Sequence, residues 1–147
     1  MKSATLWFRI SAVILLLFAV GHTFGFLTFK PPTEQGLAVR ESMANVHFQV
    51  DGKIFSYGGF YRGFGLSATI SMLFEGFVCW FLGGLARRHP REVVAIGWAL
   101  IVQQVAGMAL SLMYFGVPPI IFSAVLTVCI VIATLLAAKS GKATANA

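Results

Sequence analysis

The side chains that can do chemistry in this sequence lie inside long apolar segments. Glu75 is the only charged residue within residues 63–86, Gln103 and Gln104 stand side by side in a second apolar segment, and His22 lies in a third. An ionisable group at membrane depth costs about 2.5–3.5 kcal/mol on insertion scales, so it rarely faces lipid and marks a functional site by default. These residues are therefore the starting point for function.

Glu75 belongs to a series of residues spaced four apart, Ser67, Ser71, Glu75 and Cys79. Residues at this spacing share a helix face, which predicts a semi-polar stripe that faces the interior of a helix bundle. Glu75 has two interpretations. Its carboxyl group either joins helices by hydrogen bonding to the adjacent glutamines, or it handles a proton or contacts a ligand.

His22 lies closest in depth to Ser71, because a helix rises about 1.5 Å per residue. It either makes an interhelical hydrogen bond or contacts a ligand. No second histidine lies at metal-ligand spacing, so the sequence does not predict a metal site. Tyr61 and Arg62 are either an aromatic belt with a snorkelling arginine or the entrance to a pocket. The candidate ligand-binding residues are His22, Tyr61, Arg62, Ser71, Glu75, Gln103 and Gln104.

The elements that must position these residues are four membrane-spanning helices. Of the 147 residues, 58% are hydrophobic and 11% are charged, whereas soluble domains carry about 25% charged residues. A span needs about 20 apolar residues, and the prolines at 118 and 119 divide the last apolar run in two. The predicted fold is an all-α four-helix bundle in a single transmembrane domain, 1–147. Its spans are about 6–29, 64–85, 93–115 and 120–138.

Residues 30–61 form an external loop between the first two spans. A short helix over Glu34–Asn45 is predicted, and its less polar face holds Val39, Met43 and Val46. Asp51-Gly52 between apolar runs predicts a β-hairpin in which Phe48 faces Phe55. We expect the hairpin to lie over the outer ends of the helices as a lid.

The distribution of Lys and Arg predicts the orientation of the chain. One side holds Lys2, Arg9, Arg87, Arg88, Arg91, Lys139 and Lys142, and the other holds Lys30, Arg40, Lys53 and Arg62. The positive-inside rule therefore places both termini in the cytoplasm. The basic residues flank apolar spans, so the net charge of +6 is a topology signal and does not indicate nucleic acid. A cleaved signal peptide is the alternative for the first span, but its apolar run continues to Phe29, past the length of such a peptide's core.

Two short elements resemble a family of small bacterial membrane proteins with four predicted helices. His22-Thr23-Phe24-Gly25 matches a His-Thr-x-Gly element in the first helix of that family. The segment from Phe55 to Leu66 is similar to an aromatic Tyr-x-x-Phe-Tyr-x-Gly-Phe-Gly-Leu element entering the second helix, with Phe55 and Gly59 where the family has arginine and aspartate. The resemblance implies a multi-pass protein of the bacterial inner membrane and implies no activity.

Three functions are consistent with these residues. The first is binding of a small amphiphile, such as a quinone or a lipid, in a pocket between helices. The second is an enzyme that uses His22 or Glu75 as acid or base. The third is a structural or accessory subunit of a homo-oligomer or membrane complex, and the sequence specifies no cofactor for any of the three.

Overall fold

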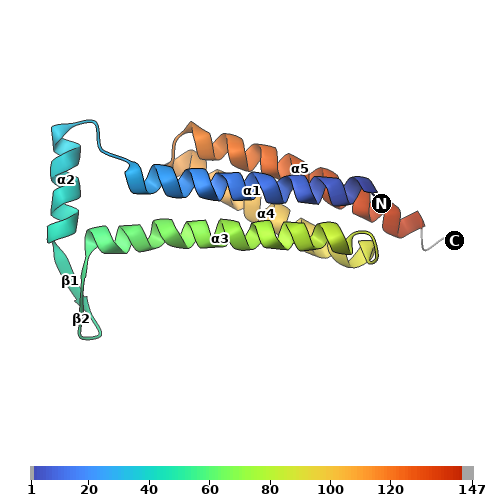
Figure 1. The fold of residues 1–147 in the computed structure, drawn as a ribbon, viewed down its shortest axis with the longest axis horizontal. Coiled ribbons are helices and arrows are strands. Elements are labelled where there is room, and N and C mark those ends of the chain that lie inside the picture. Colours follow the sequence, from blue (N-terminus) through green and yellow to red (C-terminus); the bar gives the residue numbers. More distant parts are fainter. Residues whose placement is uncertain (1, 144–147) are drawn as a thin grey trace. The chain divides into compact units, whose positions relative to one another are not determined.

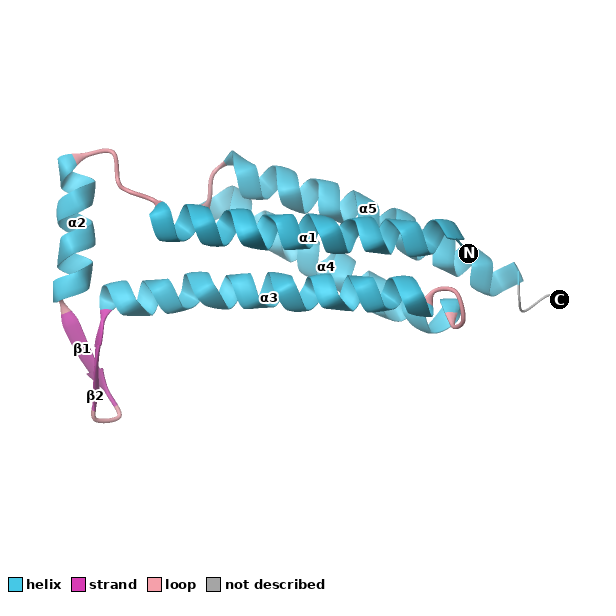
Figure 2. Cartoon of the chain, in the orientation of Figure 1, coloured by secondary structure: helices cyan, strands magenta, loops and turns pink. Residues whose placement is uncertain are grey.

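Residues 2–143 fold as five helices and one β-hairpin (Figures 1 and 2). The structure, a computed structural model, describes residues 2–143. The ends of the predicted domain, residues 1 and 144–147, lie outside this range, as does the side chain of Lys2. The elements are α1 (Lys2–Thr28), α2 (Glu34–Asn45), β1 (His47–Val50), β2 (Lys53–Ser56), α3 (Tyr57–Leu85), α4 (Pro90–Tyr114) and α5 (Val117–Ala143). The prediction of a helical membrane protein with a short helix and a hairpin after the first span is confirmed.

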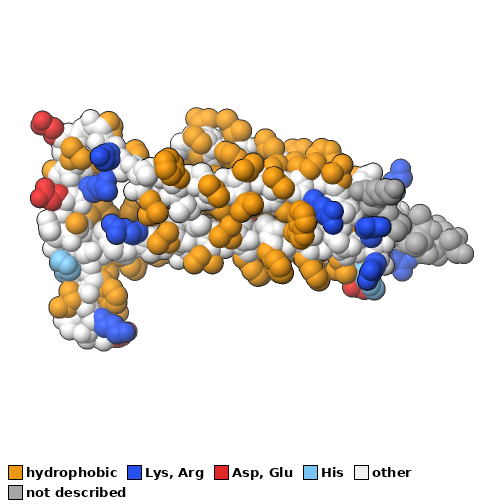
Figure 3. All heavy atoms as spheres, in the orientation of Figure 1, with side chains coloured by type: hydrophobic (Ala, Val, Ile, Leu, Met, Phe, Trp, Pro, Cys, Tyr) orange, Lys and Arg blue, Asp and Glu red, His pale blue; other side chains and the backbone are white. Residues whose placement is uncertain are grey.

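Four helices, α1, α3, α4 and α5, are long and apolar enough to cross a membrane. They extend beyond the predicted spans: α3 begins at Tyr57, and α5 includes Pro118 and Pro119 in its first turn. Proline is tolerated there because the first-turn N–H groups have no partner within the helix. Large hydrophobic side chains stay exposed along these helices (Figure 3), which is the surface that a bilayer solvates.

The chain divides into two compact units, each described by itself. One unit, Met1–Phe18 with Leu73–Ala147, is called the four-helix unit, and the other, Ala19–Met72, is called the hairpin unit. The single domain expected from the sequence stays a prediction.

Small residues bring the helices of the four-helix unit close together. A Cβ built on Gly76 would lie 3.5 Å from the Ala12 carbonyl oxygen, and one on Gly83 would lie 3.2 Å from that of Thr5. Between α4 and α5, Gly97 packs directly on the side chain of Thr134. Membrane helices associate through such close backbone approach, because lipid offers no hydrophobic drive for helix pairing. The core packed around these seams includes Phe8, Leu15, Leu82, Leu126 and Ile130.

The hairpin unit contains α2 and the two strands. Thr33 caps α2 by accepting a hydrogen bond from the Gly36 N–H at 3.1 Å. The strands pair in antiparallel register with Phe48 opposite Phe55, which confirms the predicted pair. Asp51 and Gly52 both have positive φ, 50° and 77°, as a two-residue hairpin turn requires. In Figure 1, α2 crosses the ends of α1 and α3, while the hairpin projects beyond the first turn of α3. The expected position of the hairpin as a lid over the outer ends of the helices stays a prediction.

We expect Gly97→Ala to destabilise the fold by about 1–3 kcal/mol, the usual cost of overpacking a core. The added methyl group would contact Thr134 Oγ1 directly, with Cγ2 at 3.0 Å and Cβ at 3.1 Å, so rotation of the Thr134 side chain does not relieve the clash. Unfolding in mixed detergent micelles, followed by circular dichroism, measures the effect.

Gly107→Ala is the matched control in the same helix, because a Cβ at Gly107 meets nothing within 4 Å. The buried Thr134 hydroxyl has no hydrogen-bond partner among the described residues, so Thr134→Ala by itself should cost little and should rescue Gly97→Ala. Equal destabilisation by both glycine substitutions would contradict the packing described for Gly97.

Candidate functional site

Glu75 is the buried polar centre of the four-helix unit. It is 5% exposed, and both of its carboxyl oxygens accept hydrogen bonds from α4. Gln104 Nε2 donates to Oε1 at 2.5 Å, and Gln103 Nε2 donates to Oε2 at 3.3 Å. These are the hydrogen bonds of the first of the two interpretations of Glu75. The carboxyl group therefore links α3 to α4 across the apolar interior.

The predicted interior stripe is correct for Glu75 and Cys79, which are buried, and wrong for Ser67 and Ser71. Both serines are exposed, and each donates its hydroxyl to the backbone carbonyl four residues earlier on α3. An α-helix turns about 100° per residue, so a strict spacing of four drifts by about 40° at each step. The packed face of α3 follows alternating spacings of four and three instead, through Gly65, Thr69, Met72, Gly76, Cys79 and Gly83.

His22 joins α1 to α3 within the hairpin unit. Its Nε2 lies 3.1 Å from the Gly65 carbonyl oxygen, and since a carbonyl group only accepts, Nε2 carries the proton. One residue further, the Thr23 hydroxyl lies 2.8 Å from that of Thr69 and donates to the Ala19 carbonyl. The sequence singled out His22, and named Thr23 only within the His22-Thr23-Phe24-Gly25 element. It missed Thr69, for which the alternating spacing of four and three along α3 was the available signal.

An aromatic stack covers this polar contact. The ring of Phe26 stacks on His22, with centroids 5.8 Å apart, and packs against Tyr61 at 5.4 Å. Gly65 leaves the space that the Phe26 ring fills, since a Cβ at that position would overlap the ring. Tyr57 and Tyr61 lie about one turn apart on α3, and Tyr61 connects to His22 through the Phe26 ring.

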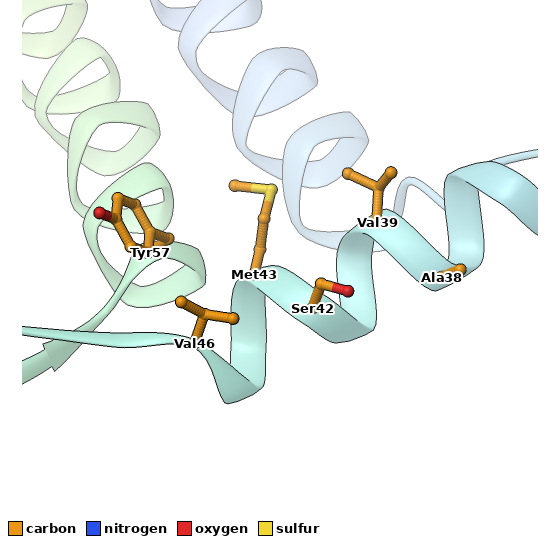
Figure 4. Close-up of a pocket in the computed structure, with 6 residues that line it drawn as sticks. All are labelled: Ala38, Val39, Ser42, Met43, Val46 and Tyr57. Carbon is orange, nitrogen blue, oxygen red and sulfur yellow. The ribbon is translucent and has the colours of Figure 1, made fainter.

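An open groove of about 320 Å³ lies between α2 and the first turn of α3 (Figure 4). Its lining residues are Ala38, Val39, Ser42, Met43, Val46 and Tyr57. The apolar face predicted for α2, with Val39, Met43 and Val46, is thus the wall of the groove. Tyr57 was not expected to take part, because the sequence placed the start of the second span seven residues later.

The remaining predicted residues are distributed over both units. Tyr61 and Arg62 are exposed on α3 and belong, like His22 and Ser71, to the hairpin unit, whereas Glu75 and the two glutamines belong to the four-helix unit. That these residues line one common pocket stays a prediction. Within residues 2–143, no three His, Cys, Asp or Glu side chains lie close enough together to hold a metal ion.

We expect Gln104→Leu to destabilise the protein more than Gln103→Leu. Gln104 is 9% exposed and makes the shorter bond to Glu75, whereas Gln103 is exposed and makes the longer one. Interhelical hydrogen bonds in membrane proteins contribute about 0.6 kcal/mol on average and up to about 1.7 kcal/mol. We expect Gln104→Leu to cost an amount near the upper value and Gln103→Leu to cost less than the average. Detergent-induced unfolding measures both losses of stability.

The same pair of substitutions in a Glu75→Leu background provides the control. There the glutamine amides have no carboxyl group to bind, so the difference between the two positions should disappear. A difference that persists would mean that Gln104 acts through packing and not through Glu75.

The two elements that suggested a family resemblance are also the elements that carry the contacts of the hairpin unit. His22-Thr23-Phe24-Gly25 supplies the contacts to Gly65 and Thr69, and the segment from Phe55 to Leu66 supplies the aromatic residues of the first turns of α3. The resemblance to a bacterial four-helix family stays an expectation. Comparison with protein-family models, with curated proteins and with solved structures finds no match for this chain.

Proposed function

We propose that this chain is a multi-pass protein of the bacterial inner membrane that binds a small amphiphile in its hairpin unit. The groove between α2 and α3 is the observation that carries the proposal. Its volume of about 320 Å³ lies at the lower end of the range of about 300–1,000 Å³ typical of small-molecule sites. Such a site takes an apolar group such as an acyl or isoprenoid chain.

The groove is held open by contacts at both ends of α2. At the middle of the helix, Arg40 Nη1 donates to the Phe29 carbonyl oxygen, just past α1, at 2.8 Å, and near its start the Thr33 hydroxyl accepts from the Gly36 N–H. At its end, the Tyr57 N–H donates to the Val46 carbonyl oxygen at 3.2 Å. A Cβ at Gly58 would lie only 3.1 Å from the Met43 carbonyl oxygen, so the glycine allows α2 to approach α3. These contacts support a groove that is formed before the ligand arrives.

The chemistry of the lining favours an uncharged amphiphile. The six lining residues carry two hydroxyl groups, on Ser42 and Tyr57, and no charged group. Burying an unpaired charge is costly, so a quinone or a neutral lipid fits this groove better than an ionic head group does. The face of α3 that leads from Tyr57 through Tyr61 towards His22 would then receive the polar end of the ligand.

Glu75 has a different role in this proposal. Its two oxygens already accept from Gln103 and Gln104, which supports its interpretation as a group that joins helices. An enzyme that uses Glu75 as acid or base would need a substrate to reach a carboxyl group that is only 5% exposed and already bonded to two amides. The enzyme and accessory-subunit alternatives therefore rank below amphiphile binding, which the groove between α2 and α3 supports directly.

Ala38→Phe tests the groove. The phenyl ring would occupy the space between α2 and α3, so we expect the affinity for dansyl-undecanoic acid to fall about tenfold or more, equivalent to about 1.4 kcal/mol. Fluorescence titration in detergent measures the affinity, and mass spectrometry of the purified protein measures co-purifying lipids and quinones.

Ala44→Phe is the matched control, because it makes the same change in the same helix at an exposed position outside the groove. It should change the affinity less than twofold. Equal affinities for the parent and Ala38→Phe, together with unchanged co-purifying lipid, would refute binding in the groove.

The proposed orientation, with both termini in the cytoplasm, has its own test. Green fluorescent protein fused after Ala147 should fluoresce, because it folds in the cytoplasm. Alkaline phosphatase inserted at Gly52 should be active, because it requires the oxidising periplasm. The reverse pattern would overturn the orientation but would leave the groove proposal untouched.

A further inference from the structure

The hairpin has two chemically different faces. Side chains alternate along a strand, and residues paired across the strands share a side, so the register assigns each residue to one face. We call one the phenyl face, which consists of Phe48, Val50, Lys53 and Phe55. The opposite face consists of His47, Gln49, Ile54 and Ser56, and only Ile54 on it is apolar.

Aromatic contacts connect the phenyl face to the surface of α3. The ring of Phe48 lies 4.9 Å from that of Tyr57 and 5.6 Å from that of Phe60, centroid to centroid. Phe60 in turn packs edge-on against Phe64 at 4.8 Å. Phe60 and Phe64 are one turn apart and are 54% and 64% exposed. They lie on a helix that is apolar enough to cross a membrane, so this surface of α3 faces lipid.

We propose that the phenyl face binds the phospholipid surface and anchors the hairpin at the boundary between acyl chains and head groups. The rings from Phe48 to Phe64 form a path that continues into the lipid-facing side of α3, and aromatic side chains favour the membrane interface. Lys53 is the only charged residue of the phenyl face, and its ammonium group lies where it can pair with lipid phosphates. Because an isolated two-stranded hairpin is marginal in water, this contact also stabilises the hairpin.

Val50 and Gln49 offer a matched pair for the test, because they are neighbours on one strand and belong to opposite faces. Each is changed to cysteine and labelled with a nitroxide in a Cys79→Ala/Cys129→Ala background. The protein is then reconstituted in phosphatidylethanolamine–phosphatidylglycerol vesicles. Electron paramagnetic resonance measures collisions of each label with oxygen, which concentrates in lipid, and with a water-soluble nickel chelate.

We expect the ratio of oxygen to nickel collisions to be several-fold higher at Val50 than at Gln49. Lys53→Glu should lower the ratio at Val50, because it repels the anionic surface. High nickel collision rates at both positions would place the hairpin in water and refute the proposal. Protection of Val50 from both reagents would also refute it, since a protein surface would then cover the phenyl face. Neither outcome depends on the groove between α2 and α3.

Discussion

The absence of water from the hydrocarbon layer is the constraint on which this structure depends. A polar group there is costly unless it finds a partner within the protein. Short side chains find one on their own helix: Ser11, Ser111 and Thr127 each donate to the carbonyl four residues earlier. The acceptor oxygens of a carboxyl group cannot do this, because the N–H groups within a helix are already bonded. Glu75 is therefore satisfied by amide donors on a second helix, and its contact to α4 follows from the chemistry of the group.

The same constraint explains why glycine is placed where helices meet. Interhelical hydrogen bonds and van der Waals contacts act over short distances, so the backbones must approach closely for them to form. On α3, Gly76 and Gly83 supply this approach in the four-helix unit, and Gly65 supplies it in the hairpin unit, where its carbonyl group also accepts from His22. Gly65 thus combines two functions, since it admits the Phe26 ring and provides the oxygen that fixes the imidazole.

The sequence predicts the parts of this structure that rest on local pattern or on rare residues. The Asp51-Gly52 turn determines the pairing of Phe48 with Phe55. Glu75 could be matched to the glutamines because few other polar side chains lie at the same depth in the membrane. The partner of His22 could not be predicted, because every residue carries a carbonyl group and no side chain marks Gly65. Ser71 was misplaced because equal spacing of four ignores the drift of the helix. Tyr57 was missed because hydropathy detects the apolar layer and not the hydrogen-bonded turns that extend α3 beyond it.

A binding site needs groups that folding has not already used. In the four-helix unit, the oxygens of Glu75 both accept from amides, and the carboxyl group is only 5% exposed. In the hairpin unit, the Arg40 side chain and the backbones of Val46 and Gly58 hold α2 against its neighbours, while the side chains of Val39 and Met43 stay available in the groove. Contacts outside the lining side chains thus maintain the shape of the groove, and the lining side chains are free to determine which ligand it accepts. This separation of roles makes the hairpin unit, and not the buried carboxyl group, the place where function is to be sought.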